Sequence, residues 1–141
     1  MPVITNRRID FKDLDLDFIK HPTTGDIVRK IGPDAIKRSV RNLIFTNFYD
    51  RKFRSAIGCN ARKILFDNIN PFTAIFLQDA IREVITNFEP RVELVPFTPD
   101  MSDDVVVHPD PDHNGYVAKI HYIIRNSGQP QTINLFLERI R

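Results

Sequence analysis

The sequence contains a single cysteine, Cys59, among its 141 residues. An internal disulfide bond is therefore impossible, and a metal cluster held by several cysteines cannot form. No basic partner that would activate the thiol is recognisable near Cys59 in the sequence. We therefore predict that Cys59 is a small, buried apolar residue.

The chain also has little net charge and no long apolar run. Its 20 Lys and Arg residues nearly balance 18 Asp and Glu residues, for a net charge of +2, so the composition does not require a polyanionic partner. No stretch is apolar enough to cross a bilayer, and the first residues lack the apolar core of a signal peptide. With 42% hydrophobic residues, we expect one soluble domain with a packed core.

Residues 1–32 have little regular pattern. Residues 14–18 alternate apolar and acidic side chains, which indicates an extended piece with one covered face. Residues 21–26 predict a turn, and residues 27–31 predict a second short strand or a docked segment. We expect an extended N-terminal arm over 1–32 and a single domain over 33–141.

Three helices are predicted after the arm. Ile36, Val40 and Leu43 recur at helical spacing within 33–47, and Asn60 begins a short helix that reaches residue 66. Asn70 and Pro71 begin the longest helix, which is predicted to end near residue 88 because Pro90 cannot continue it. Seven apolar residues of that helix are predicted to face the core: Phe72, Ile75, Phe76, Ile81, Val84, Ile85 and Phe88.

The C-terminal part is predicted to be strands. Residues 91–97, 105–107, 116–125 and 132–140 show short alternating patterns separated by turn residues. Such spacing is typical of an antiparallel meander that packs on helices. The sequence therefore predicts an α+β fold, in which two main helices and a short one pack on a C-terminal antiparallel sheet.

Two segments could contact a partner. Glu89 and Arg91 flank Pro90 at a rigid corner between helix and sheet, where they can form a bidentate ion pair or bind another chain together. The second segment is a basic loop with Arg51, Lys52, Phe53 and Arg54, which ends at Gly58. This composition suits nucleic-acid stacking and protein interfaces alike, and we expect Gly58 to adopt a backbone angle that other residues resist.

A possible calcium loop begins at Asp110. Asp110, Asp112 and Gly115 occupy the first, third and sixth positions, but the twelfth position is His121 where a bidentate Glu is needed. The same residues are also typical of a connecting turn, and His108 and His113 beside them are weak evidence for zinc. We expect neither a metal site nor a cofactor.

The order of these features resembles a family of small proteins, the baseplate wedge and sheath-initiator proteins of contractile phage tails. Related proteins occur in type VI secretion baseplates, and the family has also been labelled tail lysozyme. The resemblance extends from about residue 31 to the C-terminus. The residues that carry it are Ile36, Val40 and Leu43, the loop ending in Gly58, Leu65 and Phe66, and above all Glu89-Pro90-Arg91.

This resemblance implies a structural protein without enzymatic activity, located in the virion tail baseplate and assembled in the host cytoplasm. Its expected partners are other wedge proteins and the tail sheath protein, partly through shared β-strands. It implies that Glu89, Pro90 and Arg91 bind a partner, and the basic loop adds Arg51, Lys52 and Arg54 as candidate contacts. No nucleic acid or membrane is expected as a partner.

Two other functions remain open. A lysozyme would need two carboxylates, for which Glu89 with Glu93 or Asp67 are candidates, although Arg91 would lower the pKa of Glu89 when a general acid needs a raised one. Nucleic acid could bind through five cations, which would make affinity depend steeply on salt: Arg38, Arg41, Arg51, Lys52 and Arg54.

Overall fold

The computed structural model of the chain describes residues 11–98 and 103–140. It contains three helices and six strands within those ranges, which confirms the predicted α+β class. None of these helices combines the length and the hydropathy that a bilayer-spanning segment needs. In chain order the elements are β1 (Lys12–Leu14), β2 (Arg29–Ile31), α1 (Pro33–Phe45), α2 (Ala61–Ile64), α3 (Pro71–Phe88), β3 (Val92–Leu94), β4 (Val105–Asp110), β5 (Gly115–Ile124) and β6 (Pro130–Glu138).

The main sheet is built around β5, and all of its pairs are antiparallel. β6 pairs with one side of β5. On the other side, β4 pairs with the first half of β5 and β3 pairs with the second half, so β3 and β4 follow one another along the same side. β4, β5 and β6 form a meander as predicted. β3 departs from the prediction, because it pairs with β5 and not with β4, the next strand along the chain.

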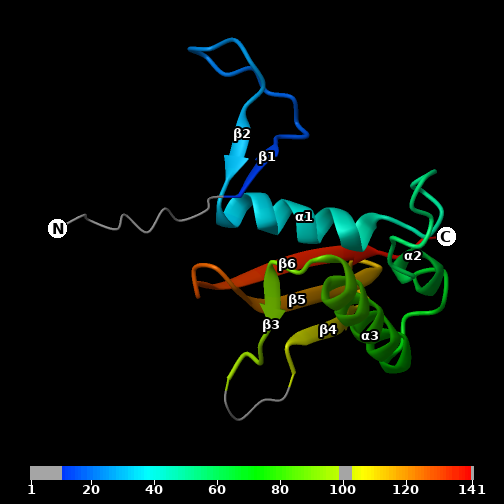
Figure 1. Cartoon of the computed structure of the whole chain (residues 1–141). Helices are drawn as coiled ribbons and strands as arrows, with labels where there is room; N and C mark the ends of the chain where they lie inside the picture. The colour runs from blue at the N-terminus through cyan, green and yellow to red at the C-terminus, as the bar shows by residue number, and fades with distance from the viewer. Residues whose placement is uncertain (1–10, 99–102, 141) are drawn as a thin grey trace.

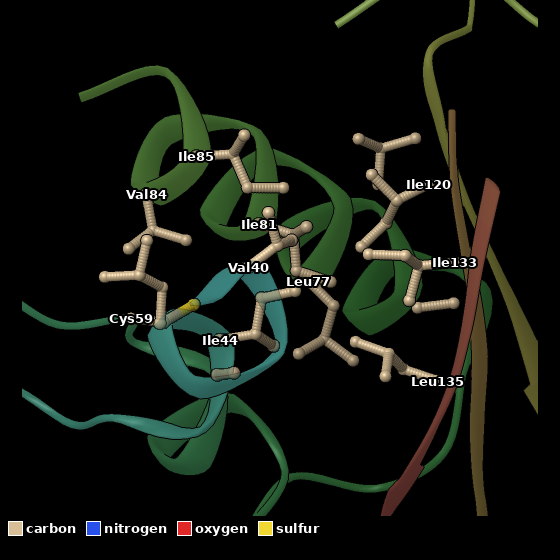
Figure 2. Close-up of a cluster of buried hydrophobic side chains, with 14 of the residues drawn as sticks. Val40, Ile44, Cys59, Leu77, Ile81, Val84, Ile85, Ile120, Ile133 and Leu135 are labelled. Carbon is tan, nitrogen blue, oxygen red and sulfur yellow. The ribbon is translucent and has the colours of Figure 1, made fainter. Parts of the chain in front are cut away.

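The helices cover one face of this sheet, as Figure 1 shows for α1 and α3. Alternate residues of β5 face them and are buried, as are three residues of β6: Tyr116, Ala118, Ile120, Tyr122, Ile124, Ile133, Leu135 and Leu137. In Figure 2, Ile120 and Ile133 point from the strands toward Leu77 on α3. Cys59 lies in the same core and is almost completely buried, as predicted.

Both ends of α3 follow from the local sequence. The side chain of Asn70 accepts a hydrogen bond of 2.8 Å from the backbone N–H of Thr73, and Pro71 occupies the first turn, where a missing donor costs nothing. The helix ends at Phe88, two residues before Pro90. α1 ends at Phe45, two residues earlier than predicted.

The predicted core face of α3 is partly wrong. Ile81, Val84 and Ile85 are buried, but Phe72, Ile75 and Phe76 are exposed, Phe72 by 74%. Thr73, Ala74 and Leu77 are the residues that the first half of α3 buries instead. The apolar stripe of this helix is therefore wider than the surface that covers it, and its N-terminal half presents large apolar side chains outward.

The segment before α1 folds back on itself as a β-hairpin. β1 and β2 pair antiparallel, and an isolated bridge joins Lys20 to Ile27. The predicted turn over residues 21–26 lies between the two bridged residues. The prediction that 14–18 has one covered apolar face is wrong, because Leu14, Leu16 and Phe18 are all exposed and Asp15 is buried. The proposed division of the chain at residue 32 stays a prediction.

Gly58 is required for a reason that differs from the predicted one. Its φ angle is not in the left-handed region. A Cβ atom at this position would instead lie 2.5 Å from the carbonyl carbon of Asn47 and 2.5 Å from the backbone nitrogen of Phe48. The backbone N–H of Cys59 donates a 2.7 Å hydrogen bond to Thr46 O. The two ends of the basic loop therefore touch, and only glycine permits this approach.

We expect Gly58→Ala to destabilise the fold by about 3 kcal/mol, because the added methyl group meets backbone that cannot move away cheaply. Gly128→Ala is the matched control. Gly128 has a φ of +65° and open space around it. The Gly128→Ala substitution should therefore cost only the strain of an alanine in the left-handed region, about 1 kcal/mol. Urea unfolding of the two variants measures the difference. Equal losses would contradict the close approach.

Candidate functional site

The corner between α3 and β3 holds a buried carboxylate. The side chain of Glu89 is 3% exposed and lies between the last turn of α3 and the first residue of β3. Arg91 donates to both of its oxygens, from Nε to Oε1 at 2.5 Å and from Nη2 to Oε2 at 2.7 Å. The predicted bidentate pair is therefore present. Ser39 on α1 donates a third bond, 2.6 Å, to Oε2.

The pair stabilises the charged form of Glu89. Burial alone would raise the pKa of Glu89, but the hydrogen bonds from Arg91 and Ser39 and the positive charge of Arg91 together lower it below the usual value. In the same way, the hydrogen bond to Glu89 raises the pKa of Arg91. Both side chains are therefore charged over the physiological pH range, and the pair as a whole carries no net charge.

An open cleft of about 490 Å³ lies beside this pair. Glu89, Pro90 and Arg91 line it, and so do Arg51 and Arg54 from the basic loop. The structure thus brings together two segments that were singled out separately in the sequence. Lys52 is exposed but does not line the cleft. Whether these residues bind a partner stays a prediction at this stage.

Three contributors to the site were missed in the sequence. Ser39 bonds Glu89 from 50 positions away, the guanidinium of Arg91 lies 5.3 Å from the centre of the Phe11 ring, and Asp13 lines the cleft. Each belongs to an element distant in sequence. Nothing local to these residues signals where the corner lies, so only the tertiary structure identifies them.

The remaining candidates are arranged otherwise. Residues 111–114 form the tight turn between β4 and β5, with His113 bonded to Asp110 at 2.9 Å, which agrees with the connecting turn that was the alternative to a calcium loop. In the described ranges, no three His, Cys, Asp or Glu side chains are grouped as a metal site would require. Arg38 and Arg41 line a separate groove, away from Arg51 and Arg54.

Glu89→Gln should make the protein less stable at pH 7 by about 1–3 kcal/mol, because it weakens a buried, charge-assisted network. The lowered pKa of Glu89 means that its contribution is complete above the unfolded-state pKa, near 4.3. The contribution is then lost as pH falls through the lower folded-state value. The difference between wild type and variant should therefore shrink as the pH falls below about 4.

Urea unfolding between pH 7 and pH 3 measures this difference, and Glu93→Gln serves as the control. Glu93 is 66% exposed and stands 4.0 Å from Arg125, so its replacement should change stability little. A constant gap between wild type and Glu89→Gln across the pH range would show that the charge of Glu89 does not contribute.

Comparison with known proteins identifies the family. The family model described as Baseplate wedge protein gp25 matches residues 32–129. The baseplate wedge protein gp25 of Enterobacteria phage T4 is 31% identical over 83 residues, which are 59% of this chain and 62% of the phage protein. The match thus spans less than two thirds of that relative.

Two solved structures share the fold. A protein from Geobacter sulfurreducens described as a tail lysozyme superposes with a TM-score of 0.66 at 21% identity, over 77% of this chain and 91% of that one. A chain of the anti-feeding prophage (AFP) baseplate superposes with a TM-score of 0.60 at 20% identity, over 94% of this chain and 88% of that one.

At identities of 20–21%, these two structures show a shared fold and nothing more. The family model, in contrast, matches well over half of the chain and so shows the family. The corner motif, the basic loop and all three helices lie within the matched residues. The chain belongs to the baseplate wedge protein gp25 family.

Proposed function

We propose that this protein joins neighbouring wedge proteins of the baseplate through the cleft at the α3–β3 corner. The observation that carries the proposal is the meeting of Glu89, Pro90 and Arg91 with Arg51 and Arg54 around one open cleft. Glu89 is buried and already bonded on both oxygens. Its part is to fix the corner, and the exposed cations are the groups that contact the partner.

The chemistry of the cleft favours an acidic partner segment. Glu89 is neutralised by Arg91, which leaves Arg51 and Arg54 facing a single acidic lining residue, Asp13. The side chain of Arg91 is still 29% exposed, so the exposed edge of its guanidinium can also contact the partner. Arginine forks bind carboxylates with defined geometry and recur at protein interfaces.

Arg51→Glu with Arg54→Glu should reduce capture of the wedge proteins encoded alongside this chain by at least about tenfold, because the partner's carboxylates would meet like charges. Arg62→Glu with Lys63→Glu is the matched control. It makes the same change of charge on exposed residues of α2 and should bind as wild type does. Pull-down with purified proteins measures capture, and circular dichroism checks folding.

Equal capture by both double variants would contradict the cleft as the docking site. Failure of the wild-type protein to capture any wedge protein would contradict the proposed function as a whole. The double change Glu89→Ala with Arg91→Ala is less informative, because it would also destabilise the corner.

A second partner surface is the free side of β6, where we infer that a strand of the tail sheath protein is added. Within the described ranges, β6 pairs with β5 alone, and an unpaired edge can accept an extended segment. A groove of about 350 Å³ lies between this strand, α1 and β2. It is lined by Ile133, Asn134 and Leu135, by one acidic residue, Asp34, and by four cations. Those cations are Lys30, Lys37, Arg38 and Arg41.

Lys37→Glu with Arg41→Glu should weaken capture of the sheath protein by about tenfold or more and leave wedge capture unchanged, because the two surfaces are separate. The α2 double variant is again the control. Loss of wedge capture in this variant would contradict the separation, and unchanged sheath capture would remove the α1–β6 groove from the proposal.

We propose no catalytic role for the corner. A glycosidase acid needs a raised pKa, whereas the pKa of Glu89 is lowered and both of its oxygens are occupied. Release of peptidoglycan fragments that depends on Glu89 would contradict this. We propose a location in the virion tail baseplate, which the family supports. Assembly in the host cytoplasm and the absence of a nucleic-acid partner stay predictions.

A further inference from the structure

The β1–β2 hairpin stands away from the main sheet and projects beyond the N-terminal end of α1 (Figure 1). Its register sets Lys12 opposite Ile31, Asp13 opposite Lys30 and Leu14 opposite Arg29. Opposed residues of an antiparallel pair share a face. The hairpin therefore has two different faces.

One face is turned toward the rest of the molecule. It carries Asp13, which lines the corner cleft, and Lys30, which lines the α1–β6 groove. Lys30 lies 3.7 Å from the buried Asp15. Beyond the strand, Asp17 accepts a 3.1 Å bond from Arg38 on α1. This inner face is held by charge pairs.

Among the described residues, the other face is about half exposed. We call it the outer face and define it by Lys12, Leu14, Arg29 and Ile31. Leu14 is 52% exposed and Ile31 is 51% exposed, and the two cations stand beside them on the same face. A two-stranded hairpin is marginally stable by itself in water. Two large aliphatic side chains directed outward add nothing to its stability unless another surface covers them.

The segment between β1 and the turn of the hairpin adds a second sign of an outward contact. Phe18 is exposed and has a φ angle of +50°. A bulky aromatic residue rarely adopts the left-handed region, and such backbone costs about 1–2 kcal/mol. Strained residues of this kind tend to occur where a side chain serves a contact. Here the strain accompanies an aromatic side chain exposed to solvent.

The comparisons bear on the same segment. The family model begins at residue 32, after the hairpin. The AFP baseplate chain, in contrast, covers 94% of this protein, so its likeness must extend into the residues before 32. The superposition thus includes residues that lie outside the part that the family model matches.

We propose that the outer face of the hairpin is a second docking surface for the wedge protein that occupies the corner cleft, and that it takes an apolar surface of this partner rimmed by carboxylates. The inference rests on the proposed function. Two observations choose this occupant. Asp13, on the inner face of the same strand, lines the cleft, so a partner seated in the cleft lies next to the hairpin. Lys12 and Arg29 favour acidic neighbours around the apolar contact, and Arg29 already lies 3.8 Å from Asp26 within the hairpin.

The test compares two double variants in binding to the purified wedge proteins encoded alongside this chain. Leu14→Ser with Ile31→Ser removes the apolar contact and should raise the dissociation constant at least about tenfold, mainly through faster dissociation. Phe72→Ser with Ile75→Ser makes the same change on the exposed part of α3 and should bind as wild type does.

A third variant keeps the apolar residues, in case the serine variant loses the hairpin. Lys12→Glu with Arg29→Glu should slow association and weaken its dependence on salt. Hydrogen exchange gives an independent measurement, because the backbone N–H groups of residues 12–31 should become protected in the wild-type complex and not in the free protein.

The outcomes separate this inference from the proposed function. Wild-type capture that needs Arg51 and Arg54, combined with unchanged binding of both hairpin variants and no added protection of residues 12–31, would overturn the hairpin surface alone. Absence of any capture by wild type would overturn both. Weaker binding of the two hairpin variants with an unaffected α3 control would support it.

Discussion

The organisation of this molecule depends on one buried carboxylate. Glu89 cannot stay charged inside the fold without partners, because an unpaired buried charge costs several kcal/mol. Its three short hydrogen bonds come from Arg91 at the start of the sheet and Ser39 on α1. Arg91 in turn lies against Phe11, next to the hairpin. One ion pair therefore connects α3, β3, α1 and the segment that precedes them.

This connection explains why the corner suits an assembly protein. The partner-facing cations lie on a loop whose ends meet at Gly58, and the loop faces a corner that Pro90 and the ion pair keep in place. The binding geometry is thus set before a partner arrives, which limits the entropy that association costs. A flexible loop with the same charges would bind more weakly.

Much of the fold could be predicted from the sequence, because its signals are local. Asn70 with Pro71 and then Pro90 mark the two ends of α3, and the alternating patterns over 116–125 and 132–140 predict the strands found as β5 and β6. The first half of α3 was misjudged since periodicity shows that Phe72 and Phe76 share a stripe, but not how far the covering surface extends. The close approach at Gly58 could not be predicted for the same reason, because it depends on the backbone of Asn47, eleven residues earlier.

The candidate site could be predicted only in part, for a related reason. Glu89, Pro90 and Arg91 are neighbours in sequence, so their pairing was foreseeable, whereas the contact from Ser39 and the shared cleft with Arg51 and Arg54 are tertiary. The same limit applies to the apolar residues that the fold leaves exposed. In a protein that works alone, Leu14, Ile31 and Phe72 would weaken solubility without benefit. Under the proposed function, Leu14 and Ile31 pack against a neighbouring protein, and the cations beside them distinguish that face from the uncharged stripe on α3.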